Sequence, residues 1–383
     1  MKKFLIIFLS IFTVFLTSSS VISVCASEQI EVKSKSSILI DADTQTIVFS
    51  KNECQRLPIA SMTKIMLLNL CFENVDSGKL NLNEQITVSK NASGMGGSQV
   101  FLEANQKYLA KDLIKSIIIA SANDASVAMS ERLYGSEANC VDEMNAKCRE
   151  WGLKDTLFSN CTGLPKPTQY SSAKDVSIML AKLIKHEEYF EYSKIWTDEI
   201  THAKGNVTSL TNTNKLIKFY DGCDGGKTGY TSESGFCLGA TAKRGNLRLI
   251  SVVINACDSK TRFADVSNLF NYGFENFTSK LVVDSTKPLN IKVKIEKSKD
   301  GEVEVIPKSD VFIFSKRNEK DKITIDFSPY KVKAPLKKDD EVGELKVFKD
   351  GVEYKTVKVV LNCDVNKKTY FDYIKDVGSN WSF

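Results

Sequence analysis

Three short motifs occur in a fixed order and at wide spacing along the chain. They are SMTK at residues 61–64, SAN at residues 121–123 and KTG at residues 227–229. Each motif is weak alone, because it combines common residues. Together they predict a nucleophilic acyl-transfer site in which lysine, instead of histidine, serves as the base.

The first motif leads into an apolar segment at residues 65–70 that predicts a buried helix. Ser61 then lies in the first turn, and Lys64 shares its face because residues three apart on a helix are neighbours. Burial and nearby cations would lower the pKa of Lys64 toward neutrality and allow it to take the Ser61 proton. Backbone N–H groups at the helix start lie where an oxyanion would form. On its own, such a motif is more often a serine cap followed by a surface lysine.

The second motif lies between two apolar helical stretches, at residues 117–120 and 127–129. Small and amide side chains at such a junction can face a cleft. Taken alone, Ser121 and Asn123 would more often be caps or turn residues.

The third motif belongs to a predicted strand, and residues 235–240 and 249–255 predict two more strands of one sheet. A strand that presents Lys227 and Thr228 outward is suited to hold an extended peptide by its carboxylate end. Gly229 lets another backbone come close. The alternative for Lys227 is a solvated strand lysine.

With these motifs the chain resembles the D-alanyl-D-alanine carboxypeptidases, low-molecular-mass penicillin-binding proteins of the serine peptidase class that are related to the serine β-lactamases. The resemblance covers nearly the whole mature chain, including GSQVFL at residues 97–102, SANDA at 121–125 and TGLP at 162–165. It implies an α/β (α+β) fold. An antiparallel sheet flanked by helices would form a β-lactamase-like catalytic domain, followed by a small C-terminal all-β domain.

The resemblance also implies catalytic roles. Ser61 would be the acylated nucleophile and Lys64 its base, while Ser121 and Asn123 would relay protons and hold the substrate amide. Ser61 would attack the penultimate D-alanine of a peptidoglycan stem peptide, release the last D-alanine and pass the shortened peptide to water. β-Lactams mimic this end of the substrate and would acylate Ser61 covalently. No metal or organic cofactor would be needed.

The same resemblance implies binding roles. Lys227 and Thr228 would clamp the carboxylate side of the substrate, and Arg262 would help to hold the terminal carboxylate. The alternative for Arg262 is a surface arginine. The N–H groups of Ser61 and Tyr230 would form the oxyanion hole. The family often carries histidine where this chain has Tyr230, but only the backbone N–H is needed there.

Three other functions share parts of this pattern. A class A β-lactamase needs a positioned glutamate to activate the deacylating water, and residues 158–170 contain none. A penicillin sensor or wall-binding module that acylates without turnover favours a transmembrane signalling segment. An endopeptidase that cuts cross-links would differ only in the shape of its cleft, so that alternative stays open.

The two histidines, His186 and His202, lie in polar sequence and are predicted to be surface residues. These two histidines argue against a Ser-His-Asp enzyme and are too few for a three-histidine zinc site. This scarcity supports the lysine-based site independently of the motifs.

The N-terminus predicts a secretory signal peptide at residues 1–26, with Lys2 and Lys3 before an apolar run and Ala26 at its end. Lipid attachment at Cys25 is the alternative. We therefore expect a secreted, extracytoplasmic protein in the cell wall or at the outer face of the cytoplasmic membrane. Loss of the two lysines lowers the net charge from +5 to +3, which is compatible with anionic cell walls. No basic-aromatic motif predicts nucleic-acid binding.

The rest of the chain divides by pattern. The predicted DD-peptidase catalytic domain spans residues 27–284. Alternating apolar and polar residues, with Asp-Gly turns, then predict a β-rich domain at residues 285–369. The aromatic, partly amphipathic tail at residues 370–383 predicts either a peripheral membrane-interface anchor or an element packed on the β domain.

Nine of the ten cysteines follow the signal peptide, and none forms a C-x-x-C pair. Their odd number and the apolar surroundings of several predict unpaired buried thiols, which suits an anoxic or reducing habitat. Cys161 and Cys223 lie near the motifs in sequence. We expect both to be structural, because a thiol nucleophile would need a nearby histidine.

Overall fold

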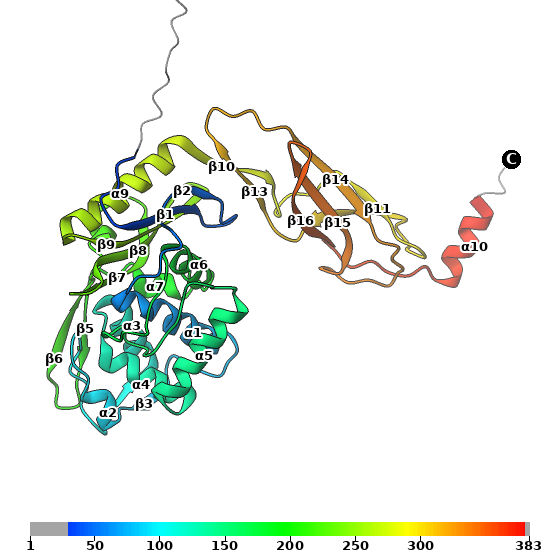
Figure 1. The fold of residues 1–383 in the computed structure, drawn as a ribbon. Coiled ribbons are helices and arrows are strands. Elements are labelled where there is room, and N and C mark those ends of the chain that lie inside the picture. Colours follow the sequence, from blue (N-terminus) through cyan, green and yellow to red (C-terminus); the bar gives the residue numbers. More distant parts are fainter. Residues whose placement is uncertain (1–29, 380–383) are drawn as a thin grey trace, which may run out of the picture. The chain divides into compact units, whose positions relative to one another are not determined.

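A five-stranded antiparallel sheet forms the scaffold of the first part of the chain (Figure 1). The computed structural model describes residues 30–379. The strand order is β2-β1-β9-β8-β7, so strands from both ends of this part lie in one sheet. Their bounds are β1 Ser36–Asp41, β2 Ile47–Lys51, β7 Cys223–Thr231, β8 Gly235–Arg244 and β9 Leu247–Ala256.

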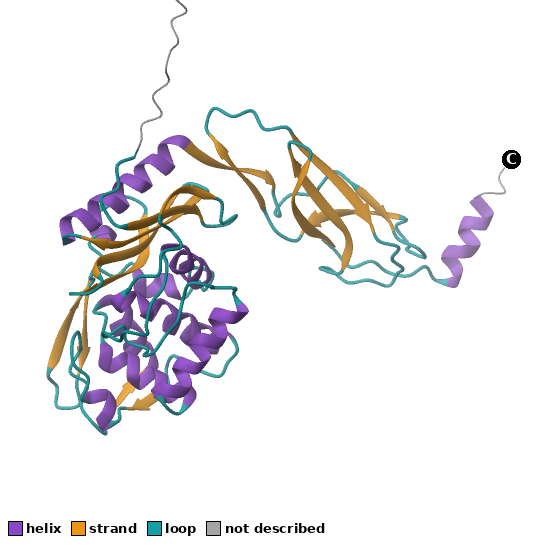
Figure 2. Ribbon diagram, in the orientation of Figure 1, coloured by secondary structure: helices purple, strands orange, loops and turns teal. Residues whose placement is uncertain are grey.

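Different helices cover the two faces of this sheet, as Figure 2 shows. Ile250 of β9 belongs to the core cluster that contains α6 (Ala173–Leu183). Its neighbour Leu249 points to the other face, where a Cβ added to Gly273 of α9 (Ser259–Asn276) would lie 2.4 Å from Leu249 Cδ1. Successive strand residues alternate between faces. Because both faces are covered, β9 is buried along nearly its whole length.

The predicted buried helix after the first motif is confirmed as α1, Lys64–Asp76, whose first nine residues are all buried. It lies at the centre of a helical group below the sheet in Figure 1. The other helices of this part are α2 Lys90–Ser93, α3 Ala110–Ile119, α4 Asn123–Tyr134, α5 Glu137–Glu150, α7 Tyr189–Ser193 and α8 Leu216–Phe219. Two hairpins complete it, β3 Gln85–Thr87 with β4 Lys107–Leu109, and β5 Thr197–Thr201 with β6 Val207–Thr211.

The later part of the chain is rich in antiparallel strands, as its alternating pattern predicts. β10 (Phe277–Val283) pairs with β13 (Val311–Lys316). A five-stranded sheet has the order β11-β12-β16-β15-β14 and a core of aliphatic side chains that are mostly valines. The strands are β11 Lys292–Lys294, β12 Glu302–Pro307, β14 Ile323–Pro329, β15 Glu341–Lys349 and β16 Val352–Leu361. The domain limits of 27–284 and 285–369 stay predictions.

The tail forms a helix, α10, at Tyr370–Ser379. Its acidic residues pair with lysines of the preceding segments: Lys368 Nζ lies 2.6 Å from Asp376 Oδ2, and Lys299 Nζ lies 3.9 Å from Asp372 Oδ1. Its apolar side chains are exposed instead of packed on the strands. Within residues 30–379, no helix is long and apolar enough to cross a bilayer. The predicted signal peptide, Trp381 and Phe383 lie outside the described residues.

The nine cysteines after the signal segment carry free thiols in the structure, and six of them are buried. Burial raises the pKa of the Cys161 thiol well above its ordinary value and raises the pKa of Cys223 to about 12. Both are therefore protonated at neutral pH, which fits the expected structural role.

The prediction that both histidines are surface residues is wrong for His202. This residue is only 7% exposed, and its ring bonds the hydroxyls of Tyr108 and Thr208 at 2.9 Å each. His186 is half-buried, bonds Asp76 at 2.6 Å and stacks on Phe72. A polar sequence did not reveal His202 because its partners come from segments distant in the chain or across a hairpin.

Candidate active site

Ser61 lies in a short 3₁₀ turn, Ala60–Thr63, that immediately precedes α1. The turn begins with strain, because Ala60 has φ of +47°, in the left-handed region that residues with a Cβ rarely adopt. Two glycines hold it in place. A Cβ at Gly163 would lie 2.1 Å from Ala60 O, and a Cβ at Gly229 would lie 2.5 Å from Ile59 O. Two segments therefore pack closely against the backbone around Ser61. Each can do so only because it has glycine at the point of contact.

Lys64 is fully buried beside the nucleophile. Its Nζ lies 3.1 Å from Ser61 Oγ and 2.7 Å from Asn123 Oδ1, and it also bonds the carbonyl of Thr162. Burial lowers the pKa of the Lys64 amine to about 7. A substantial fraction of this amine is thus neutral near pH 7 and able to accept the Ser61 proton.

The second motif reaches the same lysine through Asn123, the first residue of α4. The Asn123 amide donates to Gly96 O at 2.7 Å, and its backbone N–H donates to Ser98 O at 2.7 Å. Asn123 therefore ties Lys64 to the loop between α2 and β4. Asp124, fully buried, secures the same loop by accepting bonds from the N–H groups of Val100 and Leu102.

Ser121 combines a left-handed backbone conformation with a buried side chain. Its φ is +63°, its side chain is buried, and its hydroxyl bonds no group of residues 30–379. An unpartnered buried hydroxyl is costly unless something else bonds it. Ser121 thus offers a free donor and acceptor two residues from Asn123, which itself contacts Lys64.

The third motif lies on β7, at the edge of the sheet, against the turn that carries Ser61. Gly229 makes this approach possible, because its missing Cβ would lie 3.3 Å from Ser61 N. Lys227 is fully buried, and within residues 30–379 its Nζ bonds only the carbonyl of Thr228, at 3.2 Å. Burial, and then the cations of Lys64 and Arg262, hold the pKa of Lys227 well below its ordinary value.

Arg262 approaches β7 from the first turn of α9. Its Nη1 lies 3.3 Å from the carbonyls of Gly229 and Cys237, and its Nε has no partner within the described chain. The guanidinium packs over Phe236 and Phe263, and burial lowers its pKa to about 10. The alternative of a surface arginine is therefore wrong, because Arg262 is only 7% exposed.

The cations of Lys64, Lys227 and Arg262 thus gather at one place. None of them lies within ion-pair distance of a carboxylate of residues 30–379. An incoming anion would favour the protonated forms of these buried basic groups and pair with them. The structure therefore brings the predicted base, the predicted clamp and the predicted arginine together beside Ser61.

The side chain of Tyr230 turns away from this cluster. It is 58% exposed, and its ring lies 4.3 Å from that of Phe236. Its backbone follows Gly229 and so lies next to the turn of Ser61. This position agrees with a role for the Tyr230 N–H alone.

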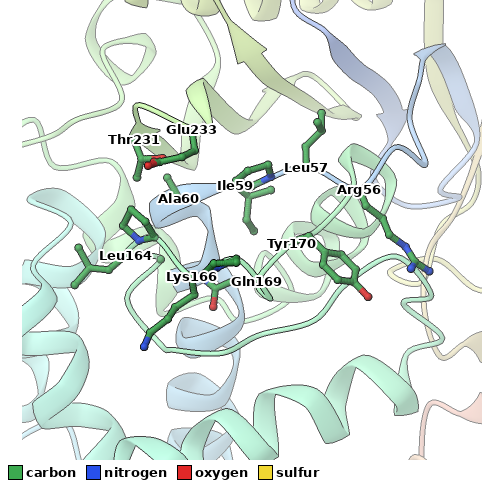
Figure 3. A pocket seen from close by; sticks show the side chains of 14 residues that line it. Arg56, Leu57, Ile59, Ala60, Leu164, Lys166, Gln169, Tyr170, Thr231 and Glu233 are labelled. Carbon is green, nitrogen blue, oxygen red and sulfur yellow. The ribbon is translucent and has the colours of Figure 1, made fainter.

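A cavity of about 530 Å³ opens beside the nucleophile, with Ala60 and Gly163 in its wall (Figure 3). Sequence reasoning missed it. Its wall comes from residues 56–60, from residues 163–170 except Thr168, and from Thr231 and Glu233. No motif marks Arg56, Lys166 or Glu233, and only the fold brings these three segments together.

Comparison with known proteins gives consistent matches. A model of the D-alanyl-D-alanine carboxypeptidase family matches residues 23–258, and a model described as penicillin-binding protein 5, C-terminal domain, matches residues 277–367. D-alanyl-D-alanine carboxypeptidase DacF of Bacillus subtilis is 38% identical over 91% of this chain and 90% of its own length.

Solved structures agree. Penicillin binding protein 5 from Haemophilus influenzae matches with a TM-score of 0.68 and 28% identity, over 88% of this chain and 98% of that one. A peptidoglycan synthesis regulatory factor (PBP3) from Streptococcus pneumoniae matches with a TM-score of 0.72 and 25% identity, over 88% of this chain and all of that one.

Proposed function

The chain belongs to the D-alanyl-D-alanine carboxypeptidase family, and we propose that it performs the reaction of this family through an acyl-enzyme on Ser61. The resemblance predicted from the motifs is confirmed, as is the α+β fold with a β-rich C-terminal region. The protein is a serine-type D-Ala-D-Ala carboxypeptidase that removes the terminal D-alanine of peptidoglycan stem peptides and binds β-lactams. The roles of individual residues are our proposal.

Acylation begins at Ser61. Its Oγ attacks the carbonyl carbon of the penultimate D-alanine while its proton passes to Lys64 Nζ, 3.1 Å away. The N–H groups of Ser61 and Tyr230 stabilise the oxyanion. As the peptide bond breaks, the departing D-alanine nitrogen receives a proton from Lys64 through the hydroxyl of Ser121. The observation that carries this proposal is the fully buried Lys64, whose pKa is lowered to about 7 beside Ser61.

The substrate carboxylate is held by the cation cluster. Lys227 and Thr228 bind it from β7, and Arg262 helps to hold it from the first turn of α9. Asn123 holds the substrate amide. Water then attacks the acyl-enzyme and releases the shortened peptide. Residues 158–170 include no glutamate to activate water on a penicilloyl-enzyme, so we expect this adduct to last for minutes or longer.

Mass spectrometry of muropeptides tests the reaction. After incubation with the purified enzyme, we expect stem pentapeptides to lose one D-alanine while cross-links stay intact. Loss of cross-links would make the protein an endopeptidase. Rapid catalytic hydrolysis of benzylpenicillin without D-alanine release would make it a β-lactamase.

Family members act on peptidoglycan outside the cytoplasm. We infer that residues 1–26 export this chain, that residues 27–284 form its catalytic domain and that residues 285–369 form a β-rich domain. The chain would then work in the cell wall or at the outer face of the cytoplasmic membrane.

We further propose that α10 binds the membrane interface. Tyr370 and Phe371 are each 76% exposed, and Ile374 and Val377 are 51% and 59% exposed. The two acidic residues of the helix are paired with lysines, which lowers the cost of placing it at a headgroup layer. We expect the mature chain to sediment with phospholipid vesicles and a chain ending at Thr369 to stay in the supernatant. Equal sedimentation of both would exclude α10 as the anchor.

A further inference from the structure

The cavity beside Ser61 lies on the N-terminal side of the peptide bond that is cleaved. Along β7, Lys227 and Thr228 come first, Tyr230 follows and Thr231 is last, and Glu233 lies in the turn just beyond the strand. A substrate with its carboxylate at Lys227 and its attacked carbonyl at the Tyr230 N–H runs antiparallel to β7. The residue that precedes the two D-alanines therefore reaches Thr231 and Glu233, which line the cavity.

Apolar side chains make up much of the wall of this cavity. Leu57, Pro58, Ile59, Leu164 and Pro165 supply most of the aliphatic wall. Such a wall suits an alkyl chain, because burial of each CH₂ is worth about 0.8 kcal/mol.

Most polar groups of the wall already have partners. Arg56 pairs with Asp155 at 3.0 Å, and its guanidinium lies over the Tyr170 ring. Gln169 Oε1 accepts the N–H groups of Ser159 and Asn160. These groups are therefore engaged in holding the wall itself.

Glu233 differs from them. Its carboxylate makes no ion pair with any residue of the described chain. Hydrogen bonds from its own backbone N–H, and then from the hydroxyls of Thr231 and Ser232, lower its pKa, so it is ionised at neutral pH. Figure 3 shows it on the side of the cavity opposite Lys166, with the apolar wall between them. An alkyl wall that ends in an ionised carboxylate without an ion-pair partner among the described residues is complementary to an alkylammonium group.

Resting on the function proposed above, we propose that Glu233 binds the side-chain ammonium of the diamino acid that precedes the two D-alanines. The enzyme then prefers stem peptides whose diamino acid carries a free amine. An amine that is acylated in a cross-link has lost its charge and pairs poorly with Glu233. The cavity thereby directs the enzyme toward stems that have not been cross-linked through this amine.

The test uses two peptides that differ only at this amine: Nα-acetyl-L-lysyl-D-Ala-D-Ala and its Nε-acetyl form. The wild-type enzyme should show a kcat/KM about threefold to fivefold higher for the free amine, the range expected of an exposed ion pair. This preference should shrink as salt is added. Glu233→Gln should bring the ratio close to one, and Glu233→Lys should reverse it.

Glu199→Gln is the matched control, because it removes the same charge from an exposed residue of β5 that does not line the cavity. It should keep the wild-type ratio. Equal kcat/KM for the two peptides in the wild type, or an unchanged ratio in both Glu233 variants, would overturn the inference while leaving D-alanine release intact. Failure to release D-alanine from either peptide would instead refute the function proposed above, and the inference with it.

Discussion

Ser61→Ala is expected to abolish covalent penicillin labelling and D-alanine release together. The 3₁₀ turn and the grip of Gly163 and Gly229 on its backbone place this hydroxyl at the start of α1, beside Lys64. Removal of a serine nucleophile costs on the order of 10⁶ in kcat, so both signals should fall below detection. Mass spectrometry of the labelled protein and a D-alanine assay would measure them.

The control for this change lies at the other end of the same helix. Ser77 is the C-cap of α1 and is exposed, so Ser77→Ala should keep both activities. Alanine is well tolerated in a helix, and Ser61→Ala should also retain the wild-type melting temperature. Label attached to a different serine of a folded Ser61→Ala enzyme would contradict the assignment of the nucleophile.

The sequence predicts the catalytic pair well because the interaction is local. Lys64 lies three positions after Ser61, and helical spacing alone brings the two side chains together. The apolar residues that follow predict burial, and burial is the main cause of the lowered pKa of Lys64. The detail that spacing missed is the 3₁₀ turn, which begins at the strained Ala60.

The sequence could not predict the contacts between segments that are distant along the chain. The bond from Lys64 to Asn123 spans 59 positions, and the bond to the Thr162 carbonyl spans 98. Gly163 looks like an ordinary turn residue until its φ of +83° and its approach to Ala60 are known. The binding role that we propose for Glu233 depends on the cavity, whose wall comes mostly from segments distant in the sequence.

The β-rich part shows the same limit. The period of two predicts strands at residues such as Val347 and Val359. It does not predict that β12, besides pairing with its sequence neighbour β11, also pairs with β16, which lies far along the chain. In the tail, Asp372 and Asp376 pair with Lys299 and Lys368, which lie outside residues 370–379, so the sequence of the tail alone does not reveal these pairs.

Lys64 should govern the pH dependence of acylation. Its pKa of about 7 lies below the ordinary value because burial disfavours the charged form, and only the neutral amine accepts a proton. The rate of acylation by benzylpenicillin should therefore rise about tenfold per pH unit below pH 7 and level off above it. Stopped-flow or quench measurements of the acylation rate would give this profile.

Two variants separate a base from a simple cation. Lys64→Ala should slow acylation by about 10²–10⁴-fold, the usual worth of a general base. Lys64→Arg keeps a positive charge but cannot be deprotonated near neutral pH, so it should be slowed to a similar extent and lose the rise around pH 7. Lys79→Ala, at an exposed residue just beyond α1, should behave as the wild type.

The result that would contradict this role involves Lys227. It is also fully buried with a lowered pKa, but its Nζ bonds the Thr228 carbonyl and makes no hydrogen bond with Ser61. If Lys64→Arg keeps a rise in rate around pH 7, the titrating base is a different group, and Lys227 becomes the next candidate. Because Lys64 is the amine that lies 3.1 Å from the Ser61 hydroxyl, we expect the rise to disappear.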